Sequence, residues 1–158
     1  AVIHRENIKT QSNAYSSGVF SRLASGMLIG AGEYIRAQQV RRVLAERLLA
    51  TFLDVDLLVL PMVAIPAPLI SQDTILIKER EVPVGNVLTR HTGLFNLTGS
   101  PAISLPAGFS REGLPTGIQI AGRYMDDGAV LRAAYAYEGM TNWRQFRPNL
   151  LQGQLEVS

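Results

Sequence analysis

The sequence predicts a fold that combines helices with a β-sheet, and three stretches carry this prediction. Residues 33–53 repeat apolar side chains at three- and four-residue spacing, which is typical of an amphipathic helix. Residues 57–61 are apolar without alternation, as in a strand buried on both faces. Residues 96–122 hold two apolar runs around a glycine-containing turn, which indicates a β-hairpin. Because a free hairpin is at best marginally stable, we expect it inside a larger sheet.

The composition is that of one globular domain without a basic binding surface. The chain has 158 residues, of which 47% are hydrophobic, and this length suits a single domain. Its 15 basic and 13 acidic residues give a net charge of only +2. A nucleic-acid-binding protein instead gathers its lysines and arginines on one face. We therefore expect no nucleic-acid partner.

The sequence contains neither cysteine nor a segment that could span a membrane. Without cysteine there is no disulfide, which suits a reducing compartment. Residues 57–70 are the nearest approach to the ~20 apolar residues of a membrane span, and three prolines interrupt them. We expect a cytoplasmic protein with no membrane partner. Because the chain begins without methionine and within a polar, helix-like pattern, we also expect a piece of a longer polypeptide.

The first third of the chain is expected to be helical. Residues 1–12 are compatible with a short helix, and Ser16 or Ser17 is a suitable N-cap for a second one. Residues 30–32 then form a break before the helix at 33–53.

The remaining elements are predicted in the following order. Prolines after residue 60 favour an extended loop, and residues 69–83 are a loop or a hairpin. Residues 84–97 are predicted to form one helix, weakened by Gly93. Asp126 and Asp127 cap a last helix, and residues 149–158 are expected to be a mobile tail.

Two motifs in a fixed order link the sequence to a known family. Residues 96–108 read NLTGSPAISLPAG, and residues 113–120 read GLPTGIQI. Together they resemble the C-terminal hallmark of the amidase signature family, which includes aliphatic amidases, the A subunit of glutamyl-tRNA amidotransferase and allophanate hydrolase. The resemblance covers about residues 4–148. It implies an α/β fold, in which residues 1–148 are the C-terminal part of an amidase-like domain with a mixed β-sheet flanked by helices.

The resemblance also implies a catalytic set that this sequence lacks. Members of the family use two serines and a lysine, with both serines on a Gly/Ser-rich segment that follows the lysine. Neither Lys9 nor Lys78 precedes such a segment. Ser110 misses a Gly-x-Ser-x-Gly elbow at Glu112. There is no histidine pair at metal-ligand spacing and no phosphate loop. We therefore expect no catalytic residue, no cofactor and no metal in this chain.

Six residues are candidates for the substrate pocket of the complete enzyme, and they are Arg22, Thr89, Arg90, His91, Asn96 and Gln119. By the resemblance, Arg22 matches an arginine that holds a substrate carboxylate in some members. A purely structural arginine is the alternative. In the family that the chain resembles, an acidic residue at the positions of Thr89 and Arg90 can hold an amino-acid substrate. Because neither residue is acidic here, the resemblance disfavours glutamine as the substrate.

Of the other three candidates, His91 and Asn96 keep two interpretations. His91 either faces the pocket or is a hydrogen-bonded structural histidine. Asn96 and Gln119 are expected to face inward, where buried amides usually bond the backbone. Asn96 is thus either structural or part of the pocket lining.

Two functions follow from this reasoning. The first is a C-terminal portion of a hydrolase that acts on the carbon–nitrogen bond of a small-molecule amide. This portion would supply scaffold and one wall of the acyl pocket, and the isolated chain would be inactive. The alternative is a non-catalytic structural module. It would form a homo-oligomer through an exposed sheet edge or pair with a missing N-terminal half.

Overall fold

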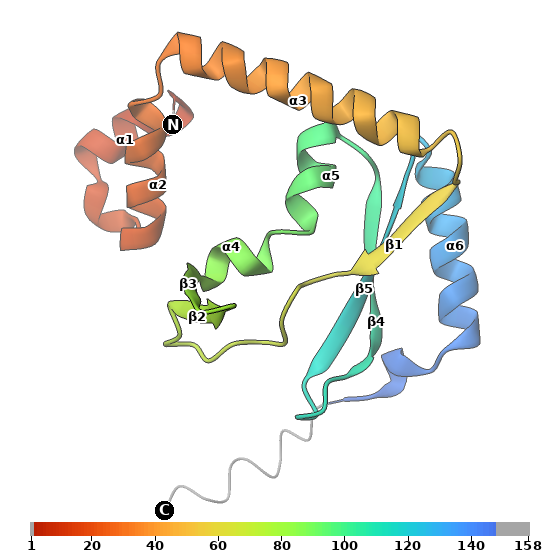
Figure 1. Cartoon of the computed structure of the whole chain (residues 1–158). Helices are drawn as coiled ribbons and strands as arrows, with labels where there is room; N and C mark the ends of the chain where they lie inside the picture. Colours follow the sequence, from red (N-terminus) through yellow and green to blue (C-terminus); the bar gives the residue numbers. More distant parts are fainter. Residues whose placement is uncertain (1, 148–158) are drawn as a thin grey trace, which may run out of the picture. The chain divides into compact units, whose positions relative to one another are not determined.

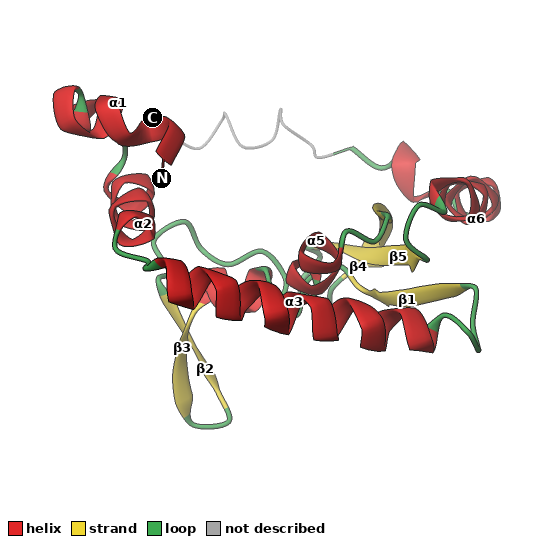
Figure 2. Ribbon diagram, turned by 90° about the horizontal axis from the view of Figure 1, so that it is seen from above, coloured by secondary structure: helices red, strands yellow, loops and turns green. Residues whose placement is uncertain are grey.

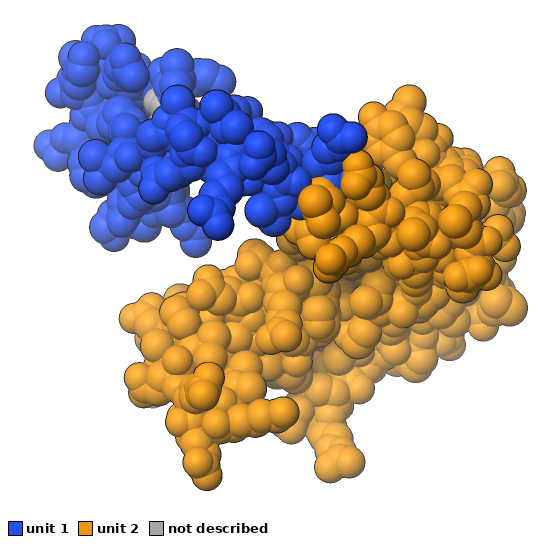
Figure 3. Space-filling view, turned by 45° about the horizontal axis from the view of Figure 1, so that its top comes forward, with its two compact units in different colours: residues 1–42 blue, residues 43–158 orange. Residues whose placement is uncertain are grey.

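The computed structural model describes residues 2–147. The chain divides into two compact units, Ala1–Arg42 and Val43–Ser158, which Figure 3 colours separately. The mobile tail expected at residues 149–158 lies outside the described residues.

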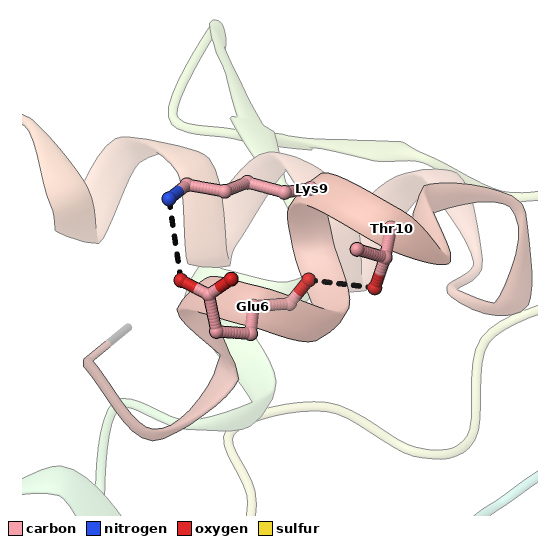
Figure 4. Close-up of polar contacts among 3 residues, drawn as sticks. All are labelled: Glu6, Lys9 and Thr10. Atoms are coloured by element: carbon pink, nitrogen blue, oxygen red, sulfur yellow. Dashed lines mark hydrogen bonds and ion pairs between the residues drawn. The ribbon is translucent and has the colours of Figure 1, made fainter.

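The first unit is helical, as the sequence predicts. It contains a 3-10 turn, η1 (Val2–His4), then α1 (Arg5–Thr10), η2 (Ser12–Ala14), α2 (Ser17–Met27) and the start of α3 (Ala31–Thr51). In α1 the carboxylate of Glu6 lies 3.2 Å from Nζ of Lys9, and the hydroxyl of Thr10 donates to the Glu6 carbonyl at 2.8 Å (Figure 4). Both contacts join residues one turn apart, and the ion pair adds a small stabilisation to this short helix.

Two details at the helix ends differ from the prediction. Ser16 occupies the N-cap position of α2, but its hydroxyl makes no capping hydrogen bond. The helix predicted at 33–53 begins earlier, at Ala31, so the break expected at residues 30–32 lies at residues 28–30. The reason is that the Glu33 carboxylate accepts a hydrogen bond from the Gly30 amide at 3.0 Å, which is one half of a capping box.

The second unit is built on a three-stranded antiparallel sheet. Its strands β1 (Leu57–Pro61), β4 (Ala102–Phe109) and β5 (Pro115–Gly122) lie in the order β1-β5-β4 (Figure 1). The predicted hairpin is therefore confirmed, and it does sit in a larger sheet. Strand β4 continues past a bulge between Pro106 and Gly108, where Gly108 takes a φ of +118° that favours glycine.

Helices cover both faces of this sheet (Figures 1 and 2). On one face, Leu58 and Ala121 pack against the C-terminal part of α3 and against Phe95 of α5 (Thr92–Thr98). On the other face, Leu105 and Ile120 pack against α6 (Asp127–Met140). The expected α/β class is thus confirmed, since strands alternate their side chains between two helical layers. Every strand pair within residues 2–147 is antiparallel, so the mixed sheet of the family stays a prediction.

Strand β1 is less buried than its composition suggests. The sequence predicts burial on both faces, but Val59 is 62% exposed. The prediction is wrong here because β1 lies at the edge of the described sheet, whereas α6 packs on β4 and β5.

A small hairpin and two short helices connect β1 to β4. The hairpin is β2 (Thr74–Ile77) with β3 (Arg80–Pro83), joined at Lys78 and Glu79, which both have positive φ. The single helix predicted at 84–97 is instead two helices, α4 (Val84–Leu88) and α5, because residues 89–91 form a turn.

Helix α6 begins where the sequence predicts. The Asp126 carboxylate accepts from the Ala129 amide at 3.2 Å, so the predicted N-cap of α6 is confirmed. A 3-10 turn, η3 (Trp143–Gln145), follows.

Gly122→Ala is expected to lower the free energy of unfolding by about 1–3 kcal/mol, the usual cost of overpacking a core. A Cβ at this position would lie 2.6 Å from Cγ2 of Val130, which is buried and β-branched and so cannot turn away. Urea denaturation followed by circular dichroism measures the change.

Gly139→Ala in α6 is the matched control, because nothing lies within 4 Å of the added Cβ. This variant should be as stable as the parent or slightly more so. Equal stability of the two variants would contradict the close packing of β5 on α6.

Candidate functional site: the turn between α4 and α5

The turn at residues 89–91 carries three of the six candidate residues. The hydroxyl of Thr89 donates to the Gly85 carbonyl at 2.8 Å, and the hydroxyl of Thr92 donates to the Thr89 carbonyl at 3.2 Å. Threonine side chains that bond to nearby carbonyls compete with the regular helical pattern. They give the turn a local reason to interrupt the predicted helix.

Long-range contacts fix this turn to the sheet. The ring of His91 contacts the carbonyl of Pro61, at the end of β1, with Nδ1 at 2.9 Å from the oxygen. The side-chain amide of Gln119, in β5, donates to the His91 carbonyl at 3.4 Å. Gln119 is only 4% exposed, so its amide is held inside the layer that α5 covers. His91 and Gln119 are therefore brought together, as backbone-bonded residues.

The His91 contact fixes the position of a proton. A carbonyl oxygen can only accept, so Nδ1 must carry the hydrogen. In the neutral ring, Nε2 is then the nitrogen with a free lone pair. The contact supports the structural interpretation of His91.

Arg90 lies beside a cavity of about 630 Å³ in the same unit. The cavity is lined by residues of the loop after β1, the β2–β3 hairpin, α4 and the turn, namely Ala64, Ile77, Lys78, Arg80, Val82, Asn86, Val87 and Arg90. Sequence reasoning identified only Arg90 among them. Alternation along β3, where Arg80 and Val82 share a face, is the signal that could have found the others.

The remaining two candidates lie apart from this cluster. Asn96 is exposed, which corrects the expectation that it faces inward. Because α5 begins only at Thr92, Phe95 faces the core, and the next residue points about 100° away around the helix. Arg22 is exposed on α2 in the first unit. Pocket roles for both remain predictions.

Ser110, the serine nearest to a nucleophile motif, holds a turn together. Its hydroxyl oxygen accepts hydrogen bonds from the amides of Glu112, at 3.2 Å, and Leu114, at 3.3 Å. The same hydroxyl stabilises the Glu112 carboxylate and lowers the pKa of this group. These contacts occupy Ser110 between β4 and β5.

Metal and membrane features can be checked over residues 2–147. In that range no three His, Asp or Glu side chains gather as a metal site would require. None of the helices in that range combines the length and apolar character of a membrane span.

Comparisons with known proteins find similar sequences and similar structures. Residues 9–131 match the family model described as Amidase. Over 154 residues, the chain is 32% identical to an amidase of Pseudomonas putida, covering 94% of this chain and 32% of that protein. Over the same length it is 38% identical to the A subunit of the glutamyl-tRNA(Gln) amidotransferase of Synechococcus sp. (strain JA-3-3Ab), covering 94% of this chain and 29% of that protein.

A solved structure described as a crystal structure of amidase superposes with a TM-score of 0.81 at 27% identity. The match covers 89% of this chain and 32% of that one. The chain thus spans about a third of the length of the curated relatives it matches.

The His91 ring is expected to carry its hydrogen on Nδ1 whenever the chain is folded. Nitrogen NMR of the imidazole distinguishes the two ring nitrogens directly. A neutral ring protonated on Nε2 alone would contradict the contact with Pro61.

Two variants test the energetic value of the same contact. His91→Ala is expected to lose about 0.5–1.5 kcal/mol of stability, the net value of one hydrogen bond. His91→Asn keeps an N–H donor close to the position of Nδ1 and should lose less. Urea midpoints give both values, and equal losses would show that the donor is unimportant.

Proposed function

The chain belongs to the amidase signature family, and on this premise we propose that it is the C-terminal portion of a hydrolase acting on carbon–nitrogen bonds of a small-molecule amide. This portion supplies sheet strands and one wall of the acyl pocket. The two serines and the lysine of the family belong to polypeptide outside these 158 residues. The complete enzyme needs no metal or organic cofactor and is cytoplasmic.

The observation that carries this proposal is the place of the hallmark motifs in the fold. They run from the end of α5 through most of β4 and β5; α6 packs on both strands, and the turn at 89–91 is bonded to β5 through Gln119. Strands that are packed by a helix on one face and hydrogen-bonded to a turn on the other are suited to support a pocket wall. That the chain spans about a third of its relatives is consistent with the reactive groups lying elsewhere.

The groups that break the amide bond are the part of the site that the remaining polypeptide must supply. Hydrolysis of an amide requires a nucleophile, a group that carries the proton, and donors for the oxyanion. Among the described residues, Ser110 is engaged in a turn and His91 is bonded to a backbone carbonyl. The proposal therefore assigns binding and positioning, and no bond-breaking step, to this chain.

The purified 158-residue chain is expected to release no ammonia from aliphatic or aromatic carboxamides above the buffer rate, because it lacks a nucleophile activated by a base. A coupled ammonia assay with a full-length relative as positive control makes this measurement. Turnover that disappears on replacement of a serine within residues 2–147 by alanine would refute the proposal.

A non-catalytic assembly module is the second candidate, and the edge strand β1 favours it. Strand β1 pairs with β5 on one side only within the described residues, and Val59 is exposed on it. Unpaired edges of this kind can add a strand from another chain. The partner would be a second copy or an N-terminal half.

Val59→Lys is expected to reduce self-association of the chain, because a charge on an edge strand opposes strand addition. Sedimentation velocity over a range of concentrations reports the change, and Leu131→Lys on an exposed position of α6 is the matched control. A parent chain that is monomeric at all concentrations would count against self-association.

A further inference from the structure

Three cationic side chains of the second unit line one cavity. Lys78 comes from the β2–β3 turn, Arg80 from β3 and Arg90 from the turn after α4. The eight lining residues include no aspartate or glutamate. Charges of one sign around a cavity create a field that favours a ligand of the opposite sign.

The hairpin register explains why Glu81 stays out of the cavity. Ile77 pairs with Arg80, and Leu76 pairs with Glu81. Neighbouring strand residues point to opposite faces, while cross-strand partners share a face. Ile77 and Arg80 therefore face the cavity together, and Glu81 lies on the opposite face with Leu76.

The three cations also have no acidic partner in the part of the chain that the structure describes. Within residues 2–147, none of them forms an ion pair with a carboxylate. A ligand carboxylate could therefore bond to the guanidinium groups without first displacing a protein partner. Arginine is well suited to this, because its planar group can donate two parallel hydrogen bonds to one carboxylate.

The rest of the lining is mostly apolar. Ala64, Ile77, Val82 and Val87 contribute hydrocarbon surface, and Val87 is only 4% exposed and anchored in the core. Asn86 adds one amide. The volume of about 630 Å³ lies within the ordinary range of small-molecule sites, roughly 300–1,000 Å³.

We propose that this cavity binds an organic carboxylate, with its anionic head on Arg80, Arg90 and Lys78 and its hydrocarbon part against Ile77, Val82 and Val87. Inorganic anions use the charges but not the apolar wall, so an organic carboxylate fits the whole lining better. The inference goes beyond the proposed amide chemistry and does not depend on it, since every residue involved lies in one unit of this chain.

Titration of the ¹⁵N-labelled full chain, followed by amide chemical shifts, tests the proposal. The probes are hexanoate, the neutral hexanamide of the same shape, and inorganic phosphate, all at constant ionic strength. Hexanoate is expected to shift the amides of residues 77–90 and to saturate, with hexanamide and phosphate each binding at least about tenfold more weakly. Equal binding of hexanamide would overturn the role of the cations, and equal binding of phosphate would overturn the role of the apolar wall.

Variants localise the effect. Arg80→Gln and Arg90→Gln should each weaken hexanoate binding about tenfold, by loss of a charge-assisted hydrogen bond. Arg111→Gln, in the exposed turn between β4 and β5, removes the same charge away from the cavity and should leave binding unchanged. If Arg111→Gln weakens binding as much as the other two, or if hexanoate shifts fail to saturate, the site does not exist. If a cavity variant misfolds, the comparison of the three probes on the parent chain still tests the proposal.

Discussion

The pairing of β5 with both β1 and β4 is the constraint on which the second unit depends. As the central strand, β5 must bury both of its faces, and it does so with small residues at its end. Ala121 is fully buried among Leu48, Phe52 and Phe95 on one side. Gly122 leaves room for α6 on the other side. The small residues at the end of β5, just after the second hallmark motif, are thus explained by close packing of helices on both faces of one strand.

The candidate pocket wall is attached to this same strand. Gln119 of β5 holds the carbonyl of His91, and the ring of His91 holds the end of β1. The turn at 89–91 is therefore positioned by the sheet and not by its own short helices. Arg90, in the middle of the turn, is carried with it to the edge of the cationic cavity. The sheet thus positions both the turn and the cavity cation that the turn carries.

Elements set by local signals could be predicted from the sequence, and features set by distant contacts could not. Helix α6, with its Asp126 cap, and the β4–β5 hairpin follow from neighbouring residues. The break after α4 depends partly on Gln119, which lies 28 residues from His91. Because the predicted helix at 84–97 did not include this break, the inward orientation expected of Asn96 was wrong. The exposure of Val59 reflects strand order, which periodicity does not encode. Of the cavity cations, only Arg90 was identified, because the hairpin and the turn meet only in the fold.

The central claim is that these residues build and orient a site whose nucleophile belongs to another part of the polypeptide. Labelling with a serine-reactive fluorophosphonate, read by mass spectrometry, tests this claim most directly. We expect no serine within residues 2–147 to react faster in the folded chain than in the heat-denatured chain. Stoichiometric labelling of one serine that is lost on denaturation would contradict it, because only an activated nucleophile in a formed site behaves in that way.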